Sequence, residues 1–386
     1  MIYTYHAGWL TSPPRMVFFY HIIIDMSFIT PKLVRRLLYF LLSLRLLFLF
    51  WSNLPLYTKQ YDINKSINHY HQSQYTQGDK AKLILSDSEL YIVEGHFLVN
   101  GEDPERMFPG HPTLGKYMIG LSLKYFHNPF IISYFSFCFV ILLFILISKS
   151  PLLALILTFE PLMLEQTQAA LLDIQLAIFH LLVIFSYLRF LSKKYSFKWS
   201  FFTFLFLGFS LNIKFFPVSI PLFTALIVDT VLSGNFTQFI RLIKSLPAII
   251  LGFLVGNFPY FFHHPSLISF AKFFRYKINW WAGGPHATPG GMWKVIFLNQ
   301  WDTWWGQGTI AVENWWIIWP IIFFTAFFST RRKVIYLYFI FSLILFSLGI
   351  FFPRYLVPLI PFVYLLSYDT IKWLWLKLSK KVFLKK

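Results

Sequence analysis

Long apolar segments alternate with polar connections along most of this 386-residue chain. A helix needs about 20 apolar residues to cross the hydrocarbon core of a bilayer, and several segments are shorter than this. The pattern predicts an all-α polytopic membrane protein with about ten transmembrane helices. The expected spans are 38–56, 130–148, 151–166, 174–190, 199–213, 218–232, 246–262, 315–328, 334–352 and 355–370.

Two longer polar stretches interrupt this alternation: residues 57–128, the first polar region, and residues 263–313, the second polar region. Within the first polar region, the segment 113–126 is moderately apolar, short for a span, and contains Lys116 and Lys124. We expect it to form an interfacial helix rather than a span. The expected divisions are an unassigned segment at 1–32, a membrane domain at 33–371 and a basic tail at 372–386.

Basic residues gather in every second connection between the expected spans. Because cytoplasmic loops carry an excess of Lys and Arg, both termini are expected in the cytoplasm and both polar regions outside. The basic connections contain Arg35, Arg36, Lys149, Lys193, Lys194, Lys198, Arg241, Lys244, Arg331, Arg332 and Lys333. This arrangement explains the formal net charge of +18 without a nucleic-acid partner.

The composition argues against a soluble enzyme. Charged residues make up 13% of the chain, compared with about 25% in soluble domains. The single cysteine, Cys138, lies in an apolar run, which excludes an intrachain disulfide and a cysteine-based metal site. The sequence has no Gly-rich loop of the kind that binds nucleotides. Any chemistry is therefore expected to use substrates at the outer membrane face.

The first polar region contains two candidate motifs. Asp87 and Glu89, with Tyr91 nearby, are suited to act as a general base on a hydroxyl, although a solvated acidic turn is the alternative. The sequence His-Pro-Thr-Leu-Gly-Lys runs from His111 to Lys116 and begins a helix at its proline. Such a helix start is suited to bind a phosphate. The alternative is a capped helix whose lysine extends to the membrane surface.

Three further charges lie in apolar surroundings. Asp173 begins an expected span, where a helix N-terminus stabilises a carboxylate and where an acid is also a functional candidate. Lys214 and Arg354 are expected on the outer side, where positive charges are less common. Each either extends into the membrane surface or binds a phosphate, and the planar guanidinium of Arg354 is suited to phosphate.

The second polar region and the residues just after it contain nine of the 14 tryptophans. Some of these tryptophans fit an aromatic belt at the membrane surface. Trp293, together with His286 and Asp302, lies among glycines and is also suited to contact a sugar or a prenyl chain. Flat aromatic faces bury such groups with selection for shape.

Taken in order, these motifs resemble the protein O-mannosyltransferase family and its GT-C-fold relatives, in a short bacterial or archaeal form. The matching pieces, within about 33–371, are Asp87/Glu89, HPTLGK at 111–116, ALLD ending at Asp173, NIKFF with Lys214, PHATPGGMW at 285–293 and PRYLVPLIP with Arg354. The chain departs from the family pattern where Ser88 separates Asp87 from Glu89 and where Thr113 replaces a proline.

The resemblance implies an inverting transferase that moves a sugar, expected to be mannose, from a polyprenyl or dolichyl phosphate to a Ser/Thr hydroxyl of protein. The implied roles are general base for Asp87 or Glu89, acceptor orientation or charge support for Asp173, phosphate binding for His111, Lys116, Lys214 and Arg354, and sugar or acceptor contact for Tyr91, His286, Trp293 and Asp302. No cofactor is implied with certainty. The acids are compatible with a divalent metal, but no ligand spacing requires one.

Two alternative functions stay open. One is a transferase of the same fold that modifies a lipid or a glycan, as in the aminoarabinose-transferring type. The other is a transporter or flippase of lipid-linked sugars. Transporters usually place polar residues in broken helices near the middle of the bilayer. Here the polar residues gather in two connecting regions, which argues against transport.

Overall fold

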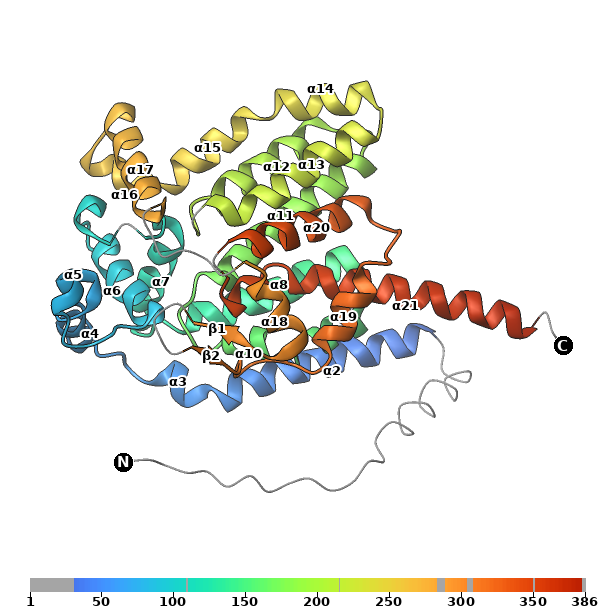
Figure 1. The fold of residues 1–386 in the computed structure, drawn as a ribbon, viewed down its shortest axis with the longest axis horizontal. Coiled ribbons are helices and arrows are strands. Elements are labelled where there is room, and N and C mark those ends of the chain that lie inside the picture. Colours follow the sequence, from blue (N-terminus) through green and yellow to red (C-terminus); the bar gives the residue numbers. More distant parts are fainter. Residues whose placement is uncertain are drawn as a thin grey trace, which may run out of the picture.

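The computed structural model describes residues 31–108, 110–214, 216–282, 289–303, 308–349 and 351–383. These residues fold into a helical bundle (Figure 1). In this described part, the only sheet consists of two-residue strands, β1 (Trp301–Asp302) and β2 (Thr309–Ile310), which pair antiparallel. The all-α prediction is therefore confirmed.

Each of the ten expected spans contains a helix, although many helix ends differ from the expected ones. In chain order these elements are α2 (Pro31–Ser52) with α3 (Leu54–Thr58), α8 (Ile131–Ser148), α9 (Pro151–Leu157) with α10 (Pro161–Glu165), α11 (Asp173–Ser192), α12 (Phe197–Ser210), η4 (Phe216–Ser219) with α13 (Ile220–Leu232), α15 (Pro247–Gly256) with α16 (Phe258–His263), α19 (Trp319–Ala326), α20 (Lys333–Leu348), and η5 (Pro353–Leu356) with α21 (Ile360–Phe383). The last helix, α21, continues into the expected basic tail.

Three helical segments of the described chain are long and apolar enough to cross a membrane: α8, α11 and the continuous stretch Phe236–Gly256. The last of these joins α14 (Phe236–Lys244) to α15. The apolar helices α12, Pro217–Leu232 and α20 are shorter. Lengths of this kind, together with the breaks between paired elements, are typical of a bundle with irregular backbone held inside protein.

Short helices form the first polar region, at the left of Figure 1. They are α4 (Ile63–His71), α5 (Gln74–Gln77), η2 (Gly78–Lys80), α6 (Asp87–Val99), η3 (Pro104–Arg106) and α7 (Thr113–Phe126). α7 coincides with the segment expected to form a non-spanning helix. The second polar region adds α17 (Leu267–Ala282) and α18 (Gly291–Leu298) before the small sheet.

Glycines allow α6 and α7 to pack with their backbones in contact. A Cβ atom added at Gly95 would lie 2.4 Å from the Lys116 carbonyl oxygen, and one added at Gly120 would lie 2.0 Å from the Gly95 carbonyl oxygen. Both distances are far below van der Waals contact, and both neighbours are backbone atoms. This close packing sets the position of Asp87 at the start of α6 relative to the start of α7.

Replacing Gly120 by alanine is expected to destabilise the protein by about 1–3 kcal/mol, the usual cost of overpacking a close contact. The added methyl group meets backbone of the neighbouring helix, so the two helices must separate. Gly291→Ala is the matched control, because a Cβ atom there meets nothing within 4 Å. Denaturant unfolding of both variants in detergent measures the effect, and equal stability of the two would contradict it.

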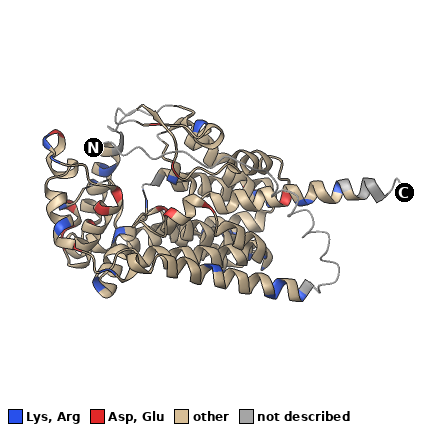
Figure 2. Ribbon diagram, turned by 90° about the horizontal axis from the view of Figure 1, so that it is seen from below, with Lys and Arg blue, Asp and Glu red and all other residues tan. Residues whose placement is uncertain are grey.

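The two polar regions contact each other in the folded chain. The rings of Phe108 and Trp280 pack edge to face with centroids 4.7 Å apart. The Lys277 amine donates a hydrogen bond to the His111 carbonyl oxygen at 3.2 Å. Figure 2 shows charged residues gathered at this end, whereas long parts of the bundle are tan. The two polar regions therefore form a polar site at one end of an apolar bundle.

Candidate functional site

Four charged side chains from four separate elements meet beside the first polar region, and we call them the central charge cluster. Asp87 begins α6, Asp173 begins α11, Lys214 follows α12 and Arg354 lies in η5. Arg354 forms an ion pair with Asp87, and Lys214 forms one with Asp173. The Arg354 Nε atom lies 3.7 Å from Asp173 Oδ2, which links the two pairs.

Two of the four side chains in the cluster are buried, and the cluster is balanced in charge. Asp173 is 1% exposed and Lys214 is 2% exposed, whereas Asp87 and Arg354 are partly exposed. Isolated charges are very costly to bury, and pairing offsets that cost. Asp173 also lies in the first turn of α11, where the helix dipole stabilises a negative charge. Two acids and two bases thus form a neutral group that is partly open to a substrate.

Aromatic side chains surround the central charge cluster. The Tyr75 hydroxyl donates a hydrogen bond to Asp87 Oδ1 at 2.9 Å. The Lys214 amine lies 4.1 Å from the centre of the Tyr355 ring, within the range of a cation–π contact. Burial alone would raise the pKa of Asp87, but the neighbouring Arg354 guanidinium outweighs burial and lowers that pKa to about 2. Asp87 is therefore ionised near neutral pH.

The structure separates the two acids that the sequence left as alternative bases. Glu89 lies two residues after Asp87 on α6, so its side chain points in another direction. Its carboxylate pairs with His69 Nδ1 at 3.0 Å. Tyr91 is buried, and its ring packs edge to face on His111 with centroids 5.5 Å apart. Of these predicted residues, Asp87 alone belongs to the central charge cluster.

The His-Pro-Thr-Leu-Gly-Lys turn is held firmly by its neighbours. The Leu114 amide donates to the Asn212 carbonyl oxygen at 3.1 Å, and the Thr113 hydroxyl donates to the Gly256 carbonyl oxygen at 3.2 Å. The first bond fixes the turn against the segment that contains Lys214, and the second fixes it against the end of α15. The motif therefore positions the start of α7 close to the central charge cluster.

A second buried group lies along this turn and contains Glu94, Lys116 and Lys277. The Lys116 amine pairs with Glu94 Oε2 at 2.8 Å. Burial raises the pKa of Glu94 despite the attraction of Lys116, and burial together with Lys116 lowers the pKa of Lys277 to about 7. Burial, reinforced by the neighbouring lysines, also holds the pKa of His111 well below its usual range.

Sequence reasoning missed Glu94 and Lys277. Glu94 was one of several acids in the first polar region, and Lys277 was one of several basic residues of the second. Their burial follows from the contact between the two regions. Each predicted phosphate-binding cation, Lys116, Lys214 or Arg354, is paired with a carboxylate.

The candidate residues of the second polar region that the structure describes do not belong to the central charge cluster. Asp302 lies in β1 and pairs with the exposed Lys294 at 2.7 Å. The Trp293 ring stacks on Phe297 and Phe327 with centroids 6.0 and 6.4 Å apart, so it belongs to a packed aromatic group. His286 lies outside the described residues.

A cavity of about 320 Å³ lies beside Arg354. Its lining comes from the α10 segment, the β1–β2 sheet with the residues that follow it, and the turn into η5. Two acids, Glu165 and Glu313, are part of this lining. The sequence analysis did not predict a cavity there.

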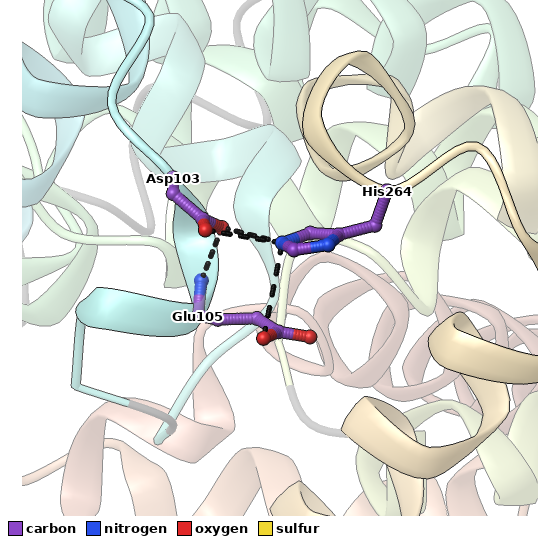
Figure 3. A group of neighbouring side chains, drawn as sticks. All are labelled: Asp103, Glu105 and His264. Atoms are coloured by element: carbon purple, nitrogen blue, oxygen red, sulfur yellow. Dashed lines mark hydrogen bonds and ion pairs between the residues drawn. The ribbon is translucent and has the colours of Figure 1, made fainter.

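A separate group joins the first polar region to the end of α16 (Figure 3). His264 Nε2 lies 3.0 Å from Asp103 Oδ2 and 3.8 Å from Glu105 Oε2. Their ligand atoms all lie within 4.8 Å of one another, and imidazole and carboxylate together are suited to several divalent metals. The same side chains also satisfy one another as ion pairs, and the Tyr260 hydroxyl donates to Glu105 at 2.9 Å.

Comparison with known proteins identifies the fold. No family model and no curated protein matches the chain. Two solved structures of ArnT from Cupriavidus metallidurans are similar to it. The apo structure has a TM-score of 0.54 and 16% identity over 75% of this chain and 56% of the ArnT chain. The structure bound to undecaprenyl phosphate has a TM-score of 0.55 and 15% identity over 80% and 59%.

The chain thus spans less than 60% of the length of the ArnT chains. At this level of identity the likeness shows the fold alone. The protein has the helical, polytopic GT-C fold. The predicted fold class is confirmed.

Proposed function

We propose that the protein is a membrane glycosyltransferase that moves a sugar from a polyprenyl phosphate to an acceptor hydroxyl. The observation that carries this proposal is the central charge cluster, which places a carboxylate beside two cations at one end of a GT-C bundle. The ArnT structure with bound undecaprenyl phosphate supports a polyprenyl phosphate as the donor. Such a donor is already activated, so the reaction needs no nucleotide.

In the proposed reaction the acceptor oxygen attacks the anomeric carbon and its proton passes to the Asp87 carboxylate. The bond between that carbon and the phosphate oxygen breaks, and the electron pair leaves with the phosphate. The leaving polyprenyl phosphate gains negative charge as the bond breaks. Lys214 and Arg354 stabilise that charge more strongly than they stabilise the donor, which is the requirement for catalysis.

In the free protein, the ion pair between Arg354 and Asp87 controls how readily Asp87 accepts a proton. Arg354 holds Asp87 as a weak base while no substrate is bound. A phosphate that binds Arg354 competes with Asp87 for the guanidinium, and loss of this partner raises the basicity of the carboxylate. Donor binding therefore activates the base. Asp173 keeps Lys214 in place and offsets positive charge at the sugar.

The sugar and the acceptor are finer parts of the proposal. The sequence motifs favour mannose and a Ser/Thr hydroxyl of protein, with the site on the outer membrane face. The alternative, a lipid or glycan acceptor as in the aminoarabinose-transferring type, is also consistent with the likeness to ArnT. Both alternatives use the same cluster.

A transfer assay tests the proposal. Purified protein in nanodiscs receives radiolabelled polyprenyl-phosphate mannose and a membrane extract. Label on a Ser/Thr peptide supports the protein acceptor, and label on a lipid supports the second alternative. Label that crosses the bilayer without transfer would establish a flippase and overturn the proposal.

A further inference from the structure

The cavity beside Arg354 has the size and the lining of a site for one sugar ring. Its volume of about 320 Å³ is near the lower limit for small-molecule sites. Such a volume suits a single ring better than a chain of sugars. The lining combines aromatic faces, two carboxylates and one amide: Trp301, Phe352, Glu165, Glu313 and Asn314.

The aromatic part of the cavity is fixed in place. The Trp301 indole donates a hydrogen bond to the Phe351 carbonyl oxygen at 3.0 Å. The rings of Trp301 and Phe352 are tilted against each other with centroids 5.5 Å apart. Rigid aromatic faces of this kind suit the apolar face of a sugar, because little side-chain entropy is lost on binding.

The polar part of the cavity accepts hydrogen bonds and is negatively charged. Glu165 is partly buried, and the Asn314 side chain belongs to the same lining. Glu313 is more exposed and precedes Asn314 in the chain. Ionised carboxylates accept strong hydrogen bonds from hydroxyl and ammonium groups. The same charges repel a carboxylate or phosphate on the ligand.

Arg354 links this cavity to the central charge cluster, since it lines the first and belongs to the second. The sugar of the proposed donor is bonded directly to the phosphate. A phosphate held at Arg354 therefore leaves the attached sugar within reach of the cavity. The guanidinium also lies 5.2 Å from the centre of the Phe352 ring, which couples the two sites through one side chain.

We propose that this cavity binds the sugar ring of the donor and selects a sugar that carries hydrogen-bond donors and no negative charge. This inference rests on the proposed function. Neutral hexoses and aminosugars share this chemistry. Uronic acids do not, because their carboxylate would face Glu165 and Glu313. The cavity is thus a specificity site, separate from the residues that move the proton.

Donor binding to the whole protein in nanodiscs tests this inference. The probes are undecaprenyl phosphate bearing mannose, an aminosugar or glucuronic acid, and undecaprenyl phosphate alone. The wild-type protein is expected to bind the mannose or aminosugar lipid at least about tenfold more tightly than the glucuronate lipid, the effect of roughly 1.4 kcal/mol. Stronger binding of the aminosugar lipid than of the mannose lipid would assign an aminosugar, and the reverse would assign a neutral hexose.

The double variant Glu165→Gln/Glu313→Gln should reduce this preference to about threefold or less. Its unchanged affinity for undecaprenyl phosphate alone would show that the fold and the phosphate site are intact. Glu102→Gln, which removes an exposed carboxylate of the first polar region, is the matched control and should keep the full preference.

Equal binding of the mannose, aminosugar and glucuronate lipids by the wild-type protein would overturn the inference. A preference that survives in the double variant would do the same. These failures are distinct from failure of the proposed function. Selective binding without any transfer would overturn the transferase alone, whereas transfer without selection would overturn the sugar site alone.

Discussion

Replacing Asp87 by asparagine is expected to lower the rate of sugar transfer by about 10²–10⁴-fold, the usual contribution of a general base. The amide is the same size as the carboxylate and cannot take up the acceptor proton. Donor affinity should be kept or increased, because Arg354 loses its competing partner. Single-turnover kinetics with saturating donor separates these two effects.

Glu89→Gln is the control for this prediction, since it removes a neighbouring carboxylate on the same helix. In the wild-type protein the Glu89 carboxylate pairs with His69, and both side chains are partly exposed. We expect its transfer rate to stay within about threefold of the wild-type rate, because partly exposed ion pairs contribute little. Thermal unfolding of both variants confirms that each is folded. A fast Asp87→Asn enzyme, or a slow Glu89→Gln enzyme, would assign the base differently.

All four members of the central charge cluster are among the candidate residues that the sequence indicates, but the sequence did not show that they pair with one another. Asp173, Lys214 and Arg354 each interrupt apolar sequence, where an unneeded charge is costly. That cost is the physical signal that a single sequence carries. Pairing depends on tertiary contacts, since Arg354 and Asp87 are 267 positions apart. The sequence therefore assigned Lys214 and Arg354 to phosphate without finding their carboxylate partners.

Helix ends were harder to predict than the existence of the helices. The expected span 151–166 is divided into α9 and α10, because Pro161 cannot continue the preceding helix. At this break Glu160 is buried and accepts hydrogen bonds from Trp319 at 2.9 Å and Tyr364 at 2.6 Å. These partners lie far along the chain. The proline in the sequence indicates the break. The hydrogen bonds that satisfy Glu160 at the break depend on tertiary contacts, which the sequence does not show.

Buried polar residues of the two polar regions show a further limit. Lys277 lies on α17 among other basic residues, so its sequence context resembles an ordinary amphipathic helix. It becomes buried because α17 packs against the His111 turn. No local pattern distinguishes a lysine that faces water from one covered by a distant segment. The cavity beside Arg354 was not predicted for the same reason: it is formed by segments that are far apart in the sequence and leave no local pattern.

Replacing Lys214 by methionine is expected to destabilise the protein by about 3–5 kcal/mol, the cost of removing one partner of a buried ion pair. Asp173 would stay buried at 1% exposure, with the Arg354 Nε atom 3.7 Å away as its remaining cationic neighbour. Lys294→Met is the matched control, because Lys294 is 46% exposed and pairs with Asp302. Loss of that pair should cost at most about 1 kcal/mol.

A double variant separates the structural and chemical roles of the Asp173–Lys214 pair. Asp173→Asn/Lys214→Met removes both charges, so no uncompensated ion stays buried, and stability should return to within about 1 kcal/mol of the wild-type value. Transfer should remain at least about a hundredfold below wild type, because no lysine stabilises the leaving phosphate. Denaturant unfolding and the transfer assay, applied to the same samples, measure both quantities. If activity returned together with stability, the pair would serve the fold alone, and Arg354 would be left to hold the phosphate.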